Sequence, residues 1–268
     1  DQASINTRTA DPNTDPTRTN KEIRSLLTLF ARNSYIAYTA TPFANFFIDK
    51  DALSKDLYAD LYPRNFIYSL PEPKGYHGSA RIFNSESSIY HVKFVLDSEL
   101  ILPSEDSPET EVVESLEEAI LSFFLGCSVR TCRGDGKQSM SMLIHISHRI
   151  KDQNQIYMAV KDYLKGMAFK MKSERSKMEV QDRFKNVWED FKQSSMEIAK
   201  GLELDYNNLD FNQVWTHLDE LLKKVSVLEL NSSSDDILDY NANPDLKVIA
   251  IGGNTLSRGL TLEGLMCS

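Results

Sequence analysis

The sequence is poor in the residues and runs on which several classes of protein depend. Its 268 residues include only three cysteines, which form neither a Cys-x-x-Cys pair nor a ligand spacing with histidine: Cys127, Cys132 and Cys267. We therefore expect reduced thiols, without a disulfide framework or a structural zinc site. No apolar run reaches the roughly 18 residues of a membrane-spanning helix, and no secretory signal is present, so we expect a cytoplasmic protein without a membrane partner.

Positive charge is also in deficit. The 30 Lys and Arg residues face 39 Asp and Glu residues, which gives a formal net charge of −9. This balance argues against a protein that coats nucleic acid, although it is compatible with a local basic channel. At 41% hydrophobic residues the chain can bury a proper core, and its length fits one large or two modest domains.

Short apolar runs alternate with helical patterns along the chain, which predicts an α/β fold. Helical periodicity predicts a helix after Thr19, another from about 113 to 127, and a long helical segment at 151–225. That segment has three apolar stripes, the second of which comprises Met178, Val180, Phe184, Trp188 and Phe191. Strands are predicted at 35–38, 66–70, around 139–148, at 226–230 and at 248–251.

One stretch links this pattern to chemistry, because paired glycines and an arginine directly follow the buried strand 248–251. Residues 252–265 read Gly-Gly-Asn-Thr-Leu-Ser-Arg-Gly-Leu-Thr-Leu-Glu-Gly-Leu. In open α/β sheets, ligand sites collect at the carboxyl ends of parallel strands. Glycine lets a phosphate group approach the backbone closely, and the Arg258 guanidinium suits forked contact with phosphate. The alternative is an ordinary surface turn that holds an arginine.

Residues 257–261, Ser-Arg-Gly-Leu-Thr, resemble motif V of superfamily-two helicases. The longer string 252–265 is closer still to the Z1 domain, a bacterial family that is labelled an endonuclease and is similar to helicase-type ATPases. The resemblance implies that Ser257 and Arg258 bind nucleic acid and that Arg258 also takes part in catalysis. It further implies a phosphate-binding set formed by Gly252, Gly253, Gly259 and Thr261.

Two segments nearer the amino terminus extend the resemblance. The predicted strand at 35–38 runs into Thr-Ala-Thr-Pro, which resembles helicase motif III. There the hydroxyls of Thr39 and Thr41 would bond the acidic Walker B carboxylates and sense the γ-phosphate. Residues 1–7 resemble the segment that closes Walker B in the Z1 family, with Asp1 as a magnesium-binding carboxylate. The alternatives are a strand followed by a capped turn, and a polar terminal tail.

Three weaker features remain open. Lys74 lies in a Pro-Lys-Gly-Tyr segment that Z1-like sequences also carry, where it contacts nucleic acid or only packs the loop. The basic region 161–177 is either a patch that tracks a nucleic-acid strand or a solvated helix face. His145 and His148 stand where motif IV lies. On a strand they would face opposite sides, so we expect no metal site. No carboxylate pattern predicts a nuclease centre.

The order of these motifs implies part of two RecA-like lobes of the P-loop helicase type. Residues 1–102 would be the carboxy-terminal part of the first lobe, after Walker B and including motif III. Residues 103–137 would be a linker and a helix. Residues 138–268 would be the second lobe, with a helical insertion at 151–225.

The sequence lacks both a Walker A loop, Gly-x-x-x-x-Gly-Lys-Ser/Thr, and a motif VI after Arg258. In the Z1 family these lie upstream and downstream, so we expect this chain alone to hold no cofactor and to hydrolyse ATP negligibly. The resemblance implies a parent enzyme that uses ATP and Mg²⁺ and acts on DNA in bacterial restriction, phage defence or repair, with or without other subunits. Two alternatives are a non-catalytic module that binds nucleic acid or docks a partner, and another α/β enzyme with phosphate-rich ligands at the Gly252 loop.

Overall fold

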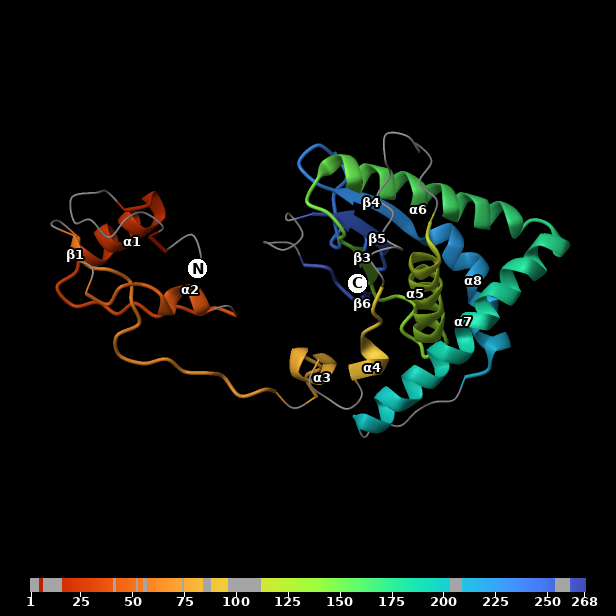
Figure 1. Ribbon diagram of the computed structural model, residues 1–268, viewed down its shortest axis with the longest axis horizontal. Helices are drawn as coiled ribbons and strands as arrows, with labels where there is room; N and C mark the ends of the chain where they lie inside the picture. The colour runs from red at the N-terminus through yellow and green to blue at the C-terminus, as the bar shows by residue number, and fades with distance from the viewer. Residues whose placement is uncertain are drawn as a thin grey trace. The chain divides into compact units, whose positions relative to one another are not determined.

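The computed structural model describes residues 5–6, 16–40, 42–51, 53–54, 57–73, 75–83, 88–95, 112–202, 209–253 and 261–268. The chain divides into two compact units, Asp1–Tyr76 and His77–Ser268 (Figure 1). The first unit holds two helices, α1 (Arg18–Thr28) and α2 (Phe43–Phe46). It also holds an antiparallel pair of two-residue strands, β1 (Leu53–Ser54) and β2 (Tyr58–Ala59).

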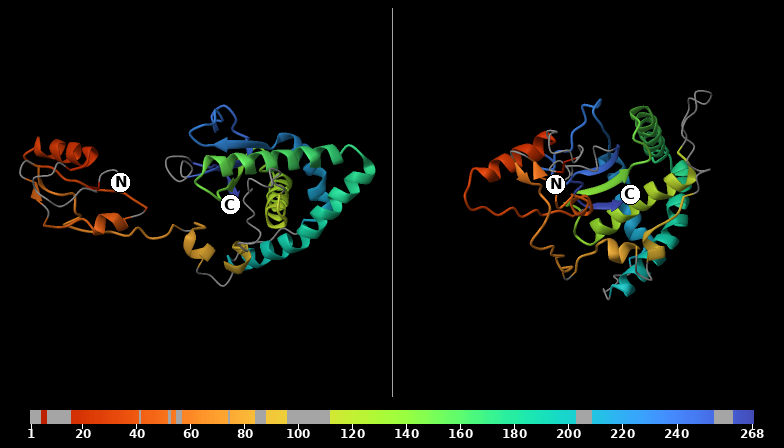
Figure 2. Two further views of the ribbon diagram at one scale, coloured as in Figure 1. Left: turned by 45° about the horizontal axis from the view of Figure 1, so that its top comes forward. Right: turned by 60° about the vertical axis from the view of Figure 1, so that its left-hand side comes forward.

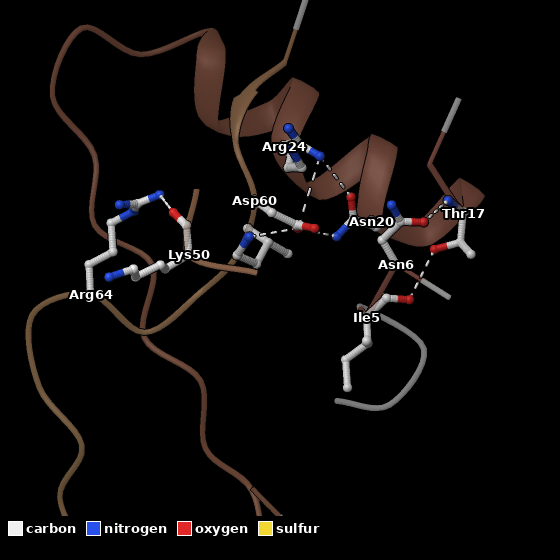
Figure 3. Close-up of polar contacts among 9 residues, drawn as sticks. Ile5, Asn6, Thr17, Asn20, Arg24, Lys50, Asp60 and Arg64 are labelled. Atoms are coloured by element: carbon white, nitrogen blue, oxygen red, sulfur yellow. Dashed lines mark hydrogen bonds and ion pairs between the residues drawn. The ribbon is translucent and has the colours of Figure 1, made fainter. Parts of the chain in front are cut away.

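A buried polar cluster fastens α1 to the end of β2 (Figure 3). Asn20 Nδ2 donates to Asp60 Oδ1 at 2.8 Å, and the same oxygen accepts the Leu61 amide at 2.7 Å. Arg24 Nη1 lies 3.9 Å from Asp60 Oδ1, with both side chains almost fully buried. Burial lowers the pKa of Arg24, whereas the charge of Asp60 raises it. Helix α1 therefore turns a polar face inward, while its apolar Leu26 is 57% exposed.

The strands predicted at 35–38 and 66–70 are wrong. Both segments are irregular, and their large side chains are exposed, including Tyr38 at 84% and Tyr68 at 71%. A strand gains stability from a hydrogen-bonded neighbour and from packing on a pleated surface, rather than from its own composition. In the described part of the first unit, the β1–β2 pair is the only ladder, so these apolar runs have no sheet to join.

The second unit is built around a four-stranded parallel sheet, which confirms the α/β prediction. Its strands are β3 (Met140–Ile144), β4 (Ser226–Leu230), β5 (Lys247–Gly252) and β6 (Leu265–Cys267), in the spatial order β4-β5-β3-β6. The predicted strand 248–251 forms the centre of β5, in which every residue is buried. A parallel strand covered on both faces needs such an unbroken apolar run.

Helices flank the strands in sequence. Two short ones come first, α3 (Ser79–Phe83) and α4 (Ser88–His91). Helix α5 (Glu114–Cys132) runs one turn beyond its predicted end and precedes β3. Between β3 and β4 lie α6 (Ile150–Lys170), α7 (Glu174–Gly201) and α8 (Phe211–Lys224), where a long helical segment was predicted. None of the helices in the described ranges is both long enough and apolar enough to cross a membrane.

The main core lies on one face of the sheet. Met140, Met142 and Ile144 alternate along β3 and, with Ile249 and Ile251 of β5, belong to a single buried cluster with α5, α6, α7 and α8. Alternate residues of a strand share a face, so all four helices pack on that side (Figure 2). One detail differs from the prediction. Met178 is 62% exposed and lies outside the buried stripe of α7, because it cannot share a helix face with Val180 two positions later.

On the opposite face, polar contacts join β3 to the segment that enters β6. Ser141 of β3 is fully buried there, and its Oγ lies 2.7 Å from the Glu263 carbonyl and 3.2 Å from the Tyr240 hydroxyl. Gly264 follows with φ +65°, and a Cβ built on it would lie 2.0 Å from the Ser139 carbonyl oxygen. Only glycine fits this entry into β6, since the backbone at Ser139 cannot give way as a side chain could.

Candidate functional site

The carboxyl edge of the parallel sheet is the candidate site. β3 ends at Ile144, which pairs with Ile251, and β4 ends at Leu230, which pairs with Gly252. Because the strands are parallel, these three ends meet at one edge, where open α/β sheets bind ligands.

The strand order favours the gap between β3 and β5 within this edge. In the order β4-β5-β3-β6, the connection that leaves β3 leads to β4 at one end of the sheet. The connection that leaves β5 leads to β6 at the other end. Neighbouring strands whose connections depart in opposite directions mark the switch point at which α/β sheets open a crevice. Gly252 ends β5 at this point and Gly253 follows it, while the loop 145–149 follows β3.

Gly253 is buried against the first turn of α6. A Cβ built on Gly253 would lie 2.4 Å from Gln153 Nε2 and 3.4 Å from the Ser147 carbonyl oxygen. The Gln153 side chain is 2% exposed and has little room to move aside. The absence of a side chain at Gly253 thus lets the end of β5 approach α6 and the loop that follows β3.

Gln153 links the ends of three strands through its amide. Its Nε2 donates to the Ser147 carbonyl at 3.0 Å, and its Oε1 accepts from Asn231 Nδ2 at 3.2 Å. Asn231 comes directly after β4 and also donates to Glu229 Oε1 at 2.9 Å. Asn154 donates to the other Glu229 oxygen at 3.0 Å. The edge is therefore held rigidly by a network in which each of these side chains has a partner.

The loop from β3 into α6 is fixed in the same way. Ser147 Oγ donates to Asp152 Oδ2 at 2.6 Å and accepts the Arg149 amide at 3.1 Å. Asp152 lies in the first turn of α6, where a carboxylate is favoured by the helix dipole. His145, His148 and Arg149 are exposed on this loop. The edge thus presents imidazole and guanidinium groups to solvent above a buried polar layer.

The structure places few of the predicted site residues at this edge. Gly252 and Gly253 lie there together, both buried. Thr261 is exposed in the segment that enters β6, whose residues Glu263 and Gly264 contact the beginning of β3. Thr39 is half-buried in the first unit. The remaining predicted residues lie outside the described ranges: Asp1, Thr41, Lys74, Ser257, Arg258 and Gly259.

Sequence reasoning missed the network around Gln153. One signal was available, because polar residues that directly follow a buried strand tend to lie at its functional edge, and both Asn231 and Ser147 follow a strand closely. His145 and His148 were assigned to a strand, whereas β3 ends at Ile144 and both histidines lie in the loop. Within the described ranges, His, Cys, Asp and Glu side chains do not gather in threes as a metal ion would require.

Comparison with known proteins adds one finding. A model of the Z1 domain family matches residues 115–268, which is more than half of the chain. No curated protein and no solved structure matches the chain. The matched region begins in α5 and contains the whole parallel sheet together with the glycine pair at its carboxyl edge. The chain therefore belongs to the Z1 domain family.

Proposed function

We propose that this chain is part of a helicase-like, ATP-dependent enzyme that acts on DNA in bacterial restriction, phage defence or repair. The observation that carries the proposal is the position of Gly252 and Gly253 at the switch point of a parallel sheet, at the start of the string that resembles motif V. Membership in the Z1 family supports it, together with the resemblance of residues 257–261 to motif V of superfamily-two helicases.

In this proposal the second unit is a RecA-like lobe and the first unit contributes to another. The rigid edge around Gln153 would hold the start of the glycine loop in place, so that Arg258 can contact the DNA backbone and couple that contact to the nucleotide cleft. Thr261 would bond the backbone, while Thr39 and Thr41 would sense the γ-phosphate beside Asp1. Ser257 and Lys74 would add contacts to DNA.

In this proposal the described residues do not by themselves form an ATP site. Asp152 and Glu229, the carboxylates at the carboxyl edge, already accept hydrogen bonds from Ser147, Asn154 and Asn231. The sequence also has no Walker A loop to cradle the phosphates. Bound ATP would supply the phosphoryl group, and Mg²⁺ would neutralise the charge on its phosphates. The proposal assigns the binding of both to the complete enzyme rather than to this chain alone.

The test is the ATPase activity of the full-length protein that carries this chain, with and without DNA. We expect Arg258→Ala to lower DNA-stimulated hydrolysis by at least tenfold while the circular dichroism spectrum stays unchanged. Arg133→Ala is the matched control, because Arg133 is exposed at the end of α5. Equal activity of Arg258→Ala and Arg133→Ala would contradict the proposal.

A second measurement checks the assignment of motifs. The 268-residue chain alone should hydrolyse ATP at a negligible rate with or without DNA. Robust DNA-stimulated turnover by this chain would show that the motifs are misplaced. DNA binding by the full-length protein without any turnover would favour the non-catalytic alternative.

A further inference from the structure

The turn between α6 and α7 is a basic surface of the second unit. We call residues 169–178 the α6–α7 tip. Figures 1 and 2 show that α6 and α7 converge there, at the end of both helices that lies away from the sheet. The 21 residues of α6 place the tip about 30 Å from the carboxyl edge, at 1.5 Å of rise per residue. The α6–α7 tip is therefore a surface separate from the glycine loop.

Four cations and one acid, Glu174, lie in the α6–α7 tip of a chain whose net charge is −9; the cations are Lys170, Lys172, Arg175 and Lys177. The first three are exposed and Lys177 is half-buried. Three other helical lysines have acidic partners, in the pairs Lys165–Asp162 on α6 and Lys223–Asp219 and Lys224–Glu220 on α8. Within the ranges that the structure describes, none of the four tip cations forms an ion pair. Their charge is left available to a partner.

Helix stability does not account for these charges. Lys170 lies in the last turn of α6, where a cation is favoured by the helix dipole. Arg175 and Lys177, however, lie in the first turn and a half of α7, where a cation is disfavoured by about 0.3–1 kcal/mol. The dipole favours Glu174 in the same turn, but it gives no reason for the two cations, whose charge is instead suited to binding an anion.

The α6–α7 tip also exposes apolar side chains. Phe169 is 73% exposed and Met178 is 62% exposed. Lys172 Nζ lies 5.9 Å from the centre of the Phe169 ring, so cation and aromatic face are presented together. Proteins that bind unpaired nucleic acid combine the same two elements, with cations for the phosphates and aromatic rings for the bases.

An anionic membrane is the other partner that attracts basic and apolar residues together, but it fits this surface poorly. A helix that lies on a membrane must turn a whole apolar face to the lipid. The apolar faces of α6 and α7 are instead buried in the core, through Ile156, Val160, Leu164 and Met167 and through Val180, Phe184 and Trp188. Two exposed apolar side chains do not make such a face.

We propose that the α6–α7 tip binds DNA, with its four cations on the phosphates and Phe169 stacked on an unpaired base. The proposal rests on the proposed function for the identity of the polymer, but it requires neither ATP nor Arg258. A contact about 30 Å from the carboxyl edge would lie about nine base pairs along a duplex. It would give the enzyme a second DNA-binding contact, separate from the glycine loop.

The test is the binding of fluorescently labelled DNA, single-stranded and duplex, to the 268-residue chain, followed by anisotropy over a range of salt concentrations. The tip variant replaces four cations: Lys170→Gln, Lys172→Gln, Arg175→Gln and Lys177→Gln. The matched control removes the same charge elsewhere: Lys185→Gln, Lys192→Gln, Lys223→Gln and Lys224→Gln. Circular dichroism and urea unfolding establish that both variants fold.

We expect the tip variant to bind at least tenfold more weakly and to lose two to four units from the slope of log affinity against log salt, roughly one for each phosphate contact. The control should change affinity less than threefold. Phe169→Ala should weaken single-strand binding at least fivefold and duplex binding less, because stacking needs an unpaired base.

Four outcomes would overturn the proposal, and the first three concern the chain, the control and the partner. They are no binding of DNA by the chain, equal weakening in the control, and binding to phosphatidylserine vesicles in place of DNA. Unchanged DNA binding by the tip variant would likewise refute the tip as the binding surface. It would leave the proposed function intact, because that function is tested separately by Arg258→Ala in the ATPase assay.

Discussion

Gly253 lies so close to the side-chain amide of Gln153 that a Cβ at position 253 would come within 2.4 Å of Gln153 Nε2. The contact joins the end of β5 to the first turn of α6 across the switch point of the sheet. Gln153 is held in turn by hydrogen bonds to Ser147 and Asn231. The glycine is thus required by the packing of the site, whatever ligand the loop beyond it binds.

The first prediction is that Gly253→Ala destabilises the protein. The new methyl group must displace a buried side chain that two hydrogen bonds hold, so we expect a loss of about 1–3 kcal/mol in the free energy of unfolding. Urea unfolding measures it. Gly166→Ala is the control, because Gly166 lies inside α6 with nothing within 4 Å of its Cβ position. That variant should gain about 0.5–1 kcal/mol from helix propensity.

A double variant separates this contact from other effects of the substitution. If the clash with Gln153 causes the loss, Gly253→Ala should cost much less in a Gln153→Ala background. An equal cost in both backgrounds would place the cause elsewhere in the loop.

The second unit was predictable because its sequence signals agree with its packing. The run at 248–251 is apolar throughout, and β5 is a central strand buried on both faces. The stripe of Ile156, Val160, Leu164 and Met167 has helical spacing, and all four residues are buried in α6. For these elements the local pattern and the tertiary environment favour the same structure.

The first unit was not predictable in the same way. The runs at 35–38 and 66–70 have strand composition but no partner strand among the described residues, and α1 buries Asn20 and Arg24 in place of Leu26. Composition reports what a segment would do on a suitable surface, and it cannot report whether that surface is present.

The candidate site shows a different limit. Asn231 and Gln153 are 78 residues apart, and a hydrogen bond between two neutral amides leaves no periodic signal in a single sequence. The position of the glycine pair was predictable because it directly follows a recognisable strand, whereas its phosphate-binding role stays a prediction. The roles of Arg258, Thr41 and the other motif residues outside the described ranges stay predictions.

The second prediction concerns Lys247, whose side chain is 3% exposed at the opposite, amino edge of the sheet. Its Nζ donates to the carbonyl oxygens of Gly136 at 3.0 Å, Gln138 at 2.8 Å and Asp245 at 2.7 Å. Lys247→Met keeps the side-chain length but leaves three carbonyl groups without their hydrogen-bond donor. We therefore expect the free energy of unfolding to fall by about 2–4 kcal/mol. The exposed Lys224, which pairs with Glu220, provides the control, and Lys224→Met should cost far less stability than Lys247→Met. Similar losses in the two variants would show that the three carbonyl contacts contribute little.

The third prediction is a pH dependence that arises from Cys127. This residue of α5 is fully buried, and burial raises the pKa of its thiol from 9.0 to about 12. The native state therefore holds the proton after the unfolded state has released it. The resulting stability is complete below pH 9 and is lost as the pH rises from 9 toward 12, by about 1.4 kcal/mol per pH unit for a single group.

Urea unfolding of the wild type and of Cys127→Ala between pH 8 and pH 11 measures this effect, since their difference cancels the other groups that titrate in the range. At pH 8 the variant should be less stable by about 1 kcal/mol or more, because it leaves a small cavity in the core. Above pH 9 the two curves should converge, as the wild type alone loses the contribution of its buried thiol. Curves that stay parallel up to pH 11 would mean that the Cys127 thiol ionises as readily in the native protein as in the unfolded chain, and that water reaches this part of the core.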